Sequence, residues 1–371
     1  MKDLHGIIFA YESDEHLREL TQHRNNTSIP YGGRYRVIDF MLSNMVNAGI
    51  DDVGLIVHDS YQSLLDHIGS AKDWDLSRKH GGLRILPPFG YADRRGHTEY
   101  RGRMDALAGV KSYLQKIRQD YVVLAGGDMA INIPLEDVYE AHRKSGADIT
   151  AVCTHKPGGD PKGCTYFTIG DNGLISDVAV RPKAVMGCES LDIFVMSKSL
   201  LISLVDHCAT HNINGLGEGV LQGMSSILKI MPYFFDGFVA RFQSVGGYYD
   251  RSMDLLDPAI RDDLFRADRP IRTKDQSNPS TYYGESARSH NSLIADGCII
   301  EGEVENSILF RGVKVAKGAR ISNCILMQST TVKENAILRH VITDKNVTIE
   351  KDRMIMGHAT YPVAVEKNAT V

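Results

Sequence analysis

Residues 291–342 contain four related phrases: Asn291-Ser292-Leu293-Ile294, Asn306-Ser307-Ile308-Leu309, Asn323-Cys324-Ile325-Leu326 and Arg339-His340-Val341-Ile342. These phrases return every 15 to 17 residues. Apolar residues are also spaced by six in this region, as Ile294 with Ile300, and as Leu309, Val315, Ile321 and Met327. The pattern predicts coils of three short strands, in which each side of a coil places one apolar residue inward.

Such coils bury their apolar faces only against the coils above and below, so a stack of them forms a parallel β-helix. Tight corners favour glycine, and Gly297, Gly302, Gly312 and Gly318 fall where the corners are expected. An ordinary antiparallel β-domain is the alternative, but it does not account for a repeated phrase.

The first ~255 residues have a different sequence pattern, in which short apolar runs alternate with amphipathic segments. The runs at 6–10, 52–57 and 120–125 predict buried strands, and the segments 35–48 and 61–68 predict helices. Continuous apolar strands separated by helices indicate a parallel sheet covered on both faces. Ligands of such sheets bind beyond the carboxyl ends of the strands, so we expect chemistry in the loops after Ala10 and Ala125.

Between the two regions, residues 258–283 are rich in Asp, Arg, Pro and Ser, which is typical of a connecting segment. We therefore expect an α/β domain at 1–257, a linker at 258–285 and the β-helix at 286–371.

Composition and charge exclude several classes of protein. The net charge is −4, and no basic surplus points to a nucleic-acid partner. No stretch approaches the ~20 apolar residues of a membrane helix. Six cysteines are scattered without a Cys-x-x-Cys pair, which argues against a zinc site or a disulfide framework. We expect reduced, buried thiols in a cytoplasmic protein.

The stretch from Ile29 to Asn44 reads Ile-Pro-Tyr-Gly-Gly-Arg-Tyr-Arg-Val-Ile-Asp-Phe-Met-Leu-Ser-Asn. It closely resembles the signature of glucose-1-phosphate adenylyltransferases, Pro-Ala-Val-Pro-x-Gly-Gly-x-Tyr-Arg-x-Ile-Asp-Phe-x-Leu-Ser-Asn, and Asn47-Ala48-Gly49-Ile50 continues it. The resemblance covers essentially the whole chain. It implies a Rossmann-like nucleotidyltransferase domain with a mixed, mostly parallel sheet, followed by a left-handed, hexapeptide-type β-helix.

The nucleotide-binding loop departs from this family. Active members follow the first strand with Gly-Gly-x-Gly-x-Arg-Leu and a later Lys-Pro, because backbone N–H groups wrap the triphosphate and the cations offset its charge. Here no glycine lies between Gly6 and Gly32. The positions that the resemblance assigns to nucleotide binding are Tyr11, Glu12, Ser13, Asp14, Glu15, His16, where the Arg was, and Asn26, where the Lys was.

Charge decides what this loop can do. Loss of one charge-stabilising contact at a reacting phosphate costs on the order of 3–4 kcal/mol. This loop loses two cations and gains three acids, so we expect nucleotide binding to be severely suppressed.

Two acids are retained in the resemblance. Gly127-Asp128-Met129 resembles the family's Gly-Asp-His, and Tyr249-Asp250-Arg251-Ser252 resembles its Arg-Asp-Val-Gly. The resemblance makes Asp128 and Asp250 the vestigial catalytic pair and a candidate Mg²⁺ site, since paired carboxylates suit that ion. The alternative is that each is an ordinary turn acid.

The other positions that the resemblance places in the pocket match the family's residues only in part. Tyr100 to Ala106 resembles the family's nucleotide-contacting Tyr-Arg-Gly-Thr-Ala-Asp-Ala, which assigns Gly102 to the nucleotide, whereas the bulky Arg103 and Met104 should crowd the pocket. For the sugar phosphate, the resemblance assigns Arg181 and Ser190. The acid before Arg181 is missing, and Leu191-Asp192 replaces the family's Met-Gly.

A retained signature with a lost loop resembles the GlgD-type subunits of glucose-1-phosphate adenylyltransferase. That resemblance implies a regulatory chain with little activity alone, which joins a GlgC-type catalytic subunit in a heterotetramer that makes ADP-glucose and pyrophosphate from ATP and glucose 1-phosphate for glycogen. A homo-oligomer and sugar-phosphate or nucleotide effectors stay open.

Two other functions stay open as well. The chain could be an active sugar-phosphate nucleotidyltransferase with a divergent loop, because Asp128 and Asp250 are retained. It could also be an acyltransferase, because left-handed β-helices often carry that activity and His340 lies in the coil repeats. The signature at 29–44 disfavours the second.

Overall fold

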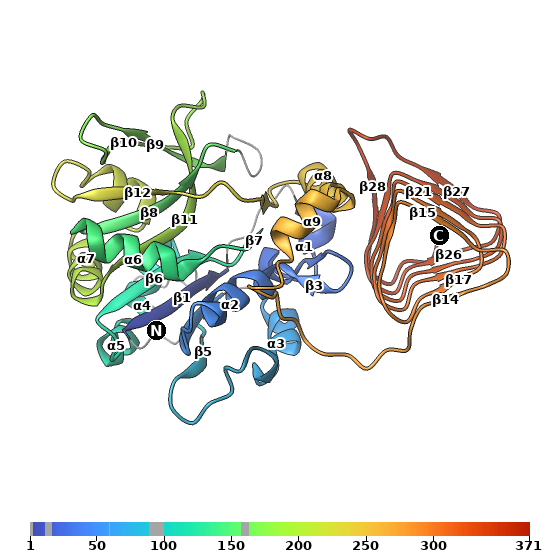
Figure 1. Cartoon of the computed structure of the whole chain (residues 1–371), viewed down its shortest axis with the longest axis horizontal. Helices are drawn as coiled ribbons and strands as arrows, with labels where there is room; N and C mark the ends of the chain where they lie inside the picture. Colours follow the sequence, from blue (N-terminus) through green and yellow to red (C-terminus); the bar gives the residue numbers. More distant parts are fainter. Residues whose placement is uncertain (1–2, 12–16, 59, 89–99, 157–162) are drawn as a thin grey trace.

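The computed structural model describes residues 3–11, 17–58, 60–88, 100–156 and 163–371. Figure 1 shows a sheet-and-helix domain beside a triangular coil, with helices α8 (Val245–Met253) and α9 (Pro258–Leu264) between them. Within the described ranges, no helix is long and apolar enough to cross a membrane.

The N-terminal domain is built on a nine-stranded sheet. Its strands are β1 (Leu4–Ala10), β4 (Asp52–Val57), β5 (Gly82–Leu86), β6 (Tyr121–Gly126), β8 (Ile149–Thr154), β9 (Thr165–Ile169), β10 (Ile175–Val180), β11 (Cys188–Ser197) and β12 (Ile230–Phe234). The order is β10-β9-β11-β6-β1-β4-β5, and β8 lies between β11 and β12. β1 runs parallel to β4 and β6, whereas β11 runs antiparallel to β6 and β8, so the predicted mixed sheet is confirmed.

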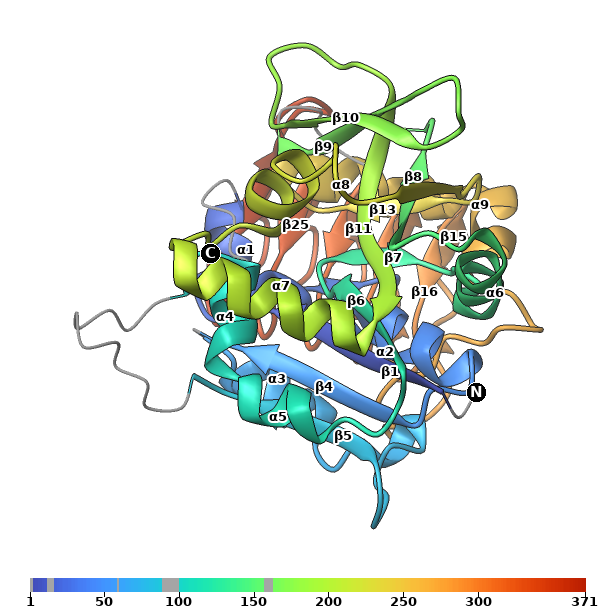
Figure 2. The same cartoon turned by 90° about the vertical axis from the view of Figure 1, so that its left-hand side faces the viewer.

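Helices cover both faces of this sheet because its strands are apolar on both sides. Ile8 packs on one face and Ile7 on the other, as successive strand residues must. The Ile8 face carries α2 (Val37–Asn47), α3 (Gln62–Ile68) and α6 (Leu135–Ser145). The Ile7 face carries α4 (Arg103–Gly109), α5 (Lys111–Lys116) and α7 (Lys198–His211), which lie in front of the sheet in Figure 2.

The C-terminal domain is the predicted left-handed parallel β-helix, with three sheets of five parallel strands. The first sheet contains β14 (Tyr282–Tyr283), β17 (Ile299–Ile300), β20 (Lys314–Val315), β23 (Thr331–Val332) and β26 (Thr348–Ile349). The second contains β15 (Arg288–His290), β18 (Glu303–Glu305), β21 (Arg320–Ser322), β24 (Ile337–Arg339) and β27 (Met354–Met356). The third contains β16 (Leu293–Ile294), β19 (Ile308–Leu309), β22 (Ile325–Leu326), β25 (Val341–Thr343) and β28 (Val363–Val365).

The repeated phrases lie in register in the third sheet, where Leu293, Ile308, Ile325 and Ile342 are successive partners. Two details of the sequence prediction were wrong. His340, not Arg339, is the equivalent of Asn323, because Ile325 pairs with Ile342. Leu326 rather than Met327 points into the coil, and Met327 packs in the cluster between the domains.

The coil corners explain why these phrases begin as they do. Their first residues, Asn291, Asn306, Asn323 and His340, have φ values of 41°, 45°, 53° and 51°, and asparagine tolerates this left-handed region better than most residues. Of the four glycines expected at corners, Gly297, Gly312 and Gly318 also have positive φ, whereas Gly302 is needed because a Cβ would lie 2.5 Å from the Ala319 carbonyl oxygen.

The predicted linker contains helix α9, whose N-terminus is capped by Asp257. β14 lies before residue 286 and already pairs with β17 of the coil. The division at residues 257 and 286 stays a prediction.

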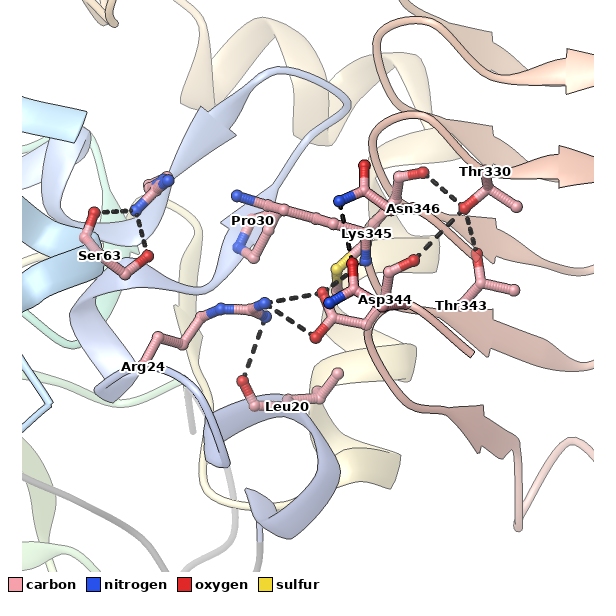
Figure 3. A network of polar contacts seen from close by, with 12 residues as sticks. Leu20, Arg24, Pro30, Ser63, Thr330, Thr343, Asp344, Lys345 and Asn346 are labelled. Atoms are coloured by element: carbon pink, nitrogen blue, oxygen red, sulfur yellow. Dashed lines mark hydrogen bonds and ion pairs between the residues drawn. The ribbon is translucent and has the colours of Figure 1, made fainter. Parts of the chain in front are cut away.

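The two domains share a buried apolar cluster. Tyr31, Val37 and Phe40 from the N-terminal domain pack with outward-facing coil residues such as Ile308 and Ile325. Polar contacts also join the domains here (Figure 3). The segment 29–44, which carries the family signature, therefore forms much of the joint between the domains.

The polar residues of that segment have structural partners. Asp39 accepts the backbone N–H of Arg36 at 2.9 Å, which begins α2, and its other oxygen lies 2.6 Å from His67 Nε2. Asn44 Nδ2 donates to the Ile131 carbonyl at 2.9 Å. Gly33 has φ 85°, and a Cβ there would contact the β-helix at Leu309. The signature therefore reports on the fold of the N-terminal domain and, through Gly33, on its contact with the β-helix.

Candidate functional site

A cavity of about 400 Å³ opens beyond the carboxyl end of β1, where the sheet topology predicts a ligand site. Its lining residues come from six segments of the chain. They are Tyr11, Tyr100, Arg101, Gly102, Arg103, Gly163, Thr165, Val180, Arg181, Asp192, Phe194, Gly215, Leu216, Gly217, Glu218 and Leu221.

Aromatic rings gather where β1 ends. The Tyr11 ring lies 6.1 Å from Phe9, 6.5 Å from His58 and 5.5 Å from Tyr100, measured between ring centroids. Burial raises the pKa of the Tyr100 hydroxyl. The rest of the predicted nucleotide loop, Glu12, Ser13, Asp14, Glu15 and His16, lies outside the described residues, and its role stays a prediction.

The other two predicted nucleotide positions lie in different places. Asn26 is buried in the 3-10 turn Asn26–Ser28 and does not line the cavity that the described residues form. Its neighbour Asn25 donates to the Ala10 carbonyl at 2.8 Å and so ties this turn to the end of β1. Gly102 does line the cavity, and a Cβ there would lie 2.4 Å from the Asn214 carbonyl oxygen.

Arg103 and Met104 differ in what they do. The Arg103 guanidinium lies 5.1 Å above the Phe9 ring and lines the cavity, as expected for a residue that crowds it. Met104 was wrongly expected there. It is fully buried in the apolar cluster beneath, because adjacent residues on helix α4 face in different directions.

Asp128 follows β6 and lies close to two arginines. A Cβ placed on Gly126 would be 2.6 Å from Asp128 Oδ1 and 3.4 Å from Arg103 Nη2, so both groups converge there. The adjacent strand is β13 (Val239–Arg241), which pairs with β7 (Met129–Ile131) and sets Arg241 opposite Met129. The strand end beside Asp128 therefore carries a guanidinium.

Arg241 is the centre of a buried ionic network. Only 4% of its surface is exposed, and its guanidinium contacts Glu189 Oε1 at 3.5 Å, Asp192 Oδ2 at 3.4 Å and the Ser190 carbonyl at 3.1 Å. It also donates to Cys164 Sγ at 3.2 Å. Burial lowers the pKa of Arg241, but the surrounding charges of Asp192, Cys164, Asp128 and Glu189 outweigh it and raise the pKa above its ordinary value.

These residues do not fit a magnesium ion. Asp250, the expected second ligand, is exposed on helix α8, while the strand end beside Asp128 carries Arg241. Mg²⁺ favours one or two carboxylates with oxygen ligands in octahedral geometry, and neighbouring guanidinium groups repel a divalent cation. Across the described residues, no group of three His, Cys, Asp or Glu side chains could hold a metal. The metal roles of Asp128 and Asp250 stay a prediction that this geometry disfavours.

The two sugar-phosphate candidates are separated by the structure. Arg181 is exposed at the cavity, and its backbone φ is 48°. Ser190 is fully buried, and its hydroxyl accepts the backbone N–H of Asp192 at 3.2 Å. Asp192, rather than Ser190, therefore presents its side chain to the cavity, and the sugar-phosphate roles stay predictions.

Sequence reasoning missed Arg241, Glu189, Asp192 and Cys164 as a network. One signal was available, because Arg241 is the single charged residue in the apolar run from Phe238 to Phe242. A charged residue inside a buried strand must have partners. Its partners could not be named without the register of β13 on β7.

His340 has a structural contact at the joint. Its Nδ1 lies 2.9 Å from the Tyr249 hydroxyl, which also donates to the Asn323 carbonyl at 2.9 Å. This contact between helix α8 and the coil accounts for His340 without an acyltransferase site.

Known proteins resemble both halves of the chain. Residues 5–245 match the nucleotidyl transferase family, and residues 280–360 match the GlmU-like, C-terminal hexapeptide family. The glycogen biosynthesis protein GlgD of Bacillus subtilis (strain 168) is 36% identical over 363 residues, which cover 98% of this chain and 95% of that protein.

Two more relatives are similar over most of the chain. The glycogen biosynthesis protein GlgD of Geobacillus stearothermophilus is 34% identical over 319 residues, covering 85% of this chain and 81% of the relative. A glucose-1-phosphate adenylyltransferase of Clostridium perfringens (strain SM101 / Type A) is 28% identical over 336 residues, covering 90% and 86%. The chain therefore belongs to the nucleotidyl transferase family and, within it, to the family of GlgD proteins.

Proposed function

We propose that this chain is a GlgD-type subunit of glucose-1-phosphate adenylyltransferase in glycogen biosynthesis. It is non-catalytic or weakly active alone and modulates a GlgC-type catalytic partner within a heterotetramer. One observation carries the proposal: the strand end beside Asp128 bears Arg241, which is already held by Glu189 and Asp192.

The physical reason lies in the charge that the reaction must offset. Nucleotidyl transfer to glucose 1-phosphate brings two polyanions together, and Mg²⁺ generally serves nucleotidyl transferases by bridging the phosphates. Here the cations beside Asp128 are fixed and engaged with carboxylates. Loss of one charge-stabilising contact costs on the order of 3–4 kcal/mol in the transition state, or two to three powers of ten in rate.

The β-helix supports the partnership. Apolar side chains are exposed near both ends of the coil, among them Tyr282 and Tyr283 in the first turn and Met354, Met356 and Tyr361 in the last. Exposed apolar groups that gather in one place commonly mark protein contacts. A homo-oligomer and bound effectors are compatible with the same surfaces. The six cysteines form no disulfide bond, which supports a cytoplasmic location.

A subunit-mixing assay tests the proposal. ADP-glucose formation is measured for this chain alone, for a co-expressed GlgC-type chain alone and for their mixture, each with ATP, Mg²⁺ and glucose 1-phosphate. We expect no turnover above background from this chain, and a changed kcat or KM in the mixture. Robust turnover by the lone chain, or kinetics of the mixture equal to those of the partner alone, contradicts it.

The second candidate is a nucleotidyltransferase that is active alone, and the retained Asp128 and the 400 Å³ cavity favour it. Calorimetric titration with ATP and Mg²⁺ separates the two. Binding heat that depends on Mg²⁺ supports the active enzyme, whereas its absence supports the regulatory subunit.

A further inference from the structure

The backbone of Asp192 is unusual for a residue within a strand. Its φ is 53°, in the left-handed region that favours glycine, and the pairing of β11 with β8 is irregular between Ser190 and Phe194. A residue other than glycine is strained in this backbone conformation, and the strain persists only when the surrounding contacts hold the residue in place. The contacts that hold Asp192 in this conformation are made by its own carboxylate.

The Asp192 carboxylate lies between two arginines that come from different elements. Its Oδ1 is 3.8 Å from Arg103 Nη1 on α4, and its Oδ2 is 3.4 Å from Arg241 Nη2 on β13. The Asp192 side chain is 27% exposed and lines the cavity. It therefore presents a negative charge to the cavity from a position between two guanidinium groups.

Both guanidinium groups are fixed before any ligand arrives. Arg103 is 11% exposed and lies above the Phe9 ring, while Arg241 is bound by the Ser190 carbonyl, Cys164 and the buried Glu189 carboxylate. Two ordered arginines with N–H groups that point to one place match the geometry of a phosphate group. The Asp192 carboxylate occupies the position between the two guanidinium groups where a phosphate group would bind.

We propose that Asp192 is a built-in anion, which engages Arg103 and Arg241 and so keeps phosphate monoesters away from the floor of the cavity. It is an autoinhibitory contact that rests on the proposed function, because it concerns the cavity of a chain that does not catalyse transfer. Removal of the Asp192 charge should convert the arginine pair into a binding site for a phosphate monoester. This binding should need no divalent cation, since the two guanidinium groups supply the positive charge.

Another acid in the same cavity provides a matched control. Glu218 lines the cavity and is exposed, and its side chain contacts neither Arg103 nor Arg241 in the described structure. Glu218→Gln removes the same charge as Asp192→Asn does, but not the carboxylate between the arginines. Asparagine retains the size of Asp192 and tolerates positive φ.

The test measures binding of inorganic phosphate and of glucose 1-phosphate to the full chain by calorimetry, with EDTA present. We expect affinity for both probes to rise by about tenfold or more in Asp192→Asn, and by much less in Glu218→Gln, because opposite and like charges a few ångström apart interact strongly at partly buried sites. Addition of Arg103→Ala to Asp192→Asn should remove the gain.

Two results overturn the proposal: unchanged affinity in Asp192→Asn, or an equal gain in Glu218→Gln. If Asp192→Asn does not fold, Asp192→Gly replaces it, since glycine suits the observed φ, and the same comparison decides. ADP-glucose formation by the native chain is measured in parallel. Robust turnover there contradicts the proposed function, whereas absent or weak turnover together with unchanged binding contradicts only the role of Asp192.

Discussion

Arg24 Nη2 lies 2.8 Å from both carboxylate oxygens of Asp344, so one guanidinium joins segments that are 320 residues apart (Figure 3). Both side chains are only 2% exposed. Arg24 also donates to the Leu20 carbonyl at 3.2 Å, at the end of α1 (Arg18–Thr21). The last turns of the coil are thereby fastened to the segment that follows the nucleotide loop.

Removal of one partner from this buried pair should destabilise the chain. Arg24→Met leaves the Asp344 carboxylate buried without its guanidinium, which costs about 3–5 kcal/mol of unfolding free energy. Arg24→Met combined with Asp344→Leu should recover part of that loss, because no charge is then left buried. Urea denaturation followed by the fluorescence of Trp74, the single tryptophan, measures both.

An exposed ion pair serves as the control. Arg78 and Asp51 lie 2.9 Å apart with side chains 37% and 54% exposed. Arg78→Ala should change the unfolding free energy by less than about 1 kcal/mol. If Arg24→Met is equally mild, the buried pair does not hold the domains together.

The stability of the joint should rise with pH because of Lys345. Burial and the nearby charges of Arg36 and Arg24 lower the pKa of Lys345 from 10.5 to about 7. The folded chain then releases this proton at a lower pH than the unfolded chain, so stability increases as pH rises above about 7. Lys345→Met should flatten that increase in urea denaturation between about pH 7 and pH 9. An equal slope in the native chain and the variant contradicts this account.

Magnesium should not stabilise the native chain. An ion that binds only the folded state raises the unfolding midpoint, and more so the tighter it binds, but Arg103 and Arg241 occupy the surroundings of Asp128. We expect the same thermal midpoint with Mg²⁺ and with EDTA. Arg241→Asp, which sets a second carboxylate opposite Met129, is the comparison variant and should gain stabilisation by Mg²⁺. A clear increase in the native chain contradicts the poor fit to the metal.

The thiols should react slowly in the folded chain. All six cysteines are buried thiols, and burial raises the pKa of Cys164 to about 11 and that of Cys324 to about 12. Cys188 differs, because a hydrogen bond with Cys153 lowers its pKa, and its protection therefore rests on burial. Thiolates, not thiols, attack disulfide reagents. Ellman's reagent should therefore label all six only when urea unfolds the chain. Rapid labelling of any cysteine before unfolding goes against this burial pattern.

The periodic parts of the fold could be predicted from sequence, because each repeat reports the same geometry. The repeated phrases at 291–342 predicted the β-helix, and the apolar runs predicted the strands β1, β4 and β6. Counting by six nevertheless placed Met327 inward, because a coil turn here advances by 17 residues rather than 18, as the pairing of Ile308 with Ile325 shows. Small deviations in period add up along a coil.

The site could be predicted only in part, because its decisive residues belong to short, irregular elements. Asp128 and Arg103 could be assigned to the pocket from the sequence because they lie in segments that resemble motifs of the family. Arg241 was missed because β13 has three residues, and only its register on β7 brings it beside Asp128. Asp192 was noted merely as a replaced glycine, since the direction of its side chain depends on the backbone irregularity in β11.

The segment 29–44 has a consequence for reading genomes. Gly33 faces the β-helix, and Asp39 and Asn44 hold elements of the N-terminal domain together, so the motif serves the fold and its presence does not depend on turnover. A gene identified by this motif alone will be credited with an enzyme activity that the encoded protein need not have. The buried arginine opposite Met129 lies outside that motif, so the motif carries no information about the charge beside Asp128.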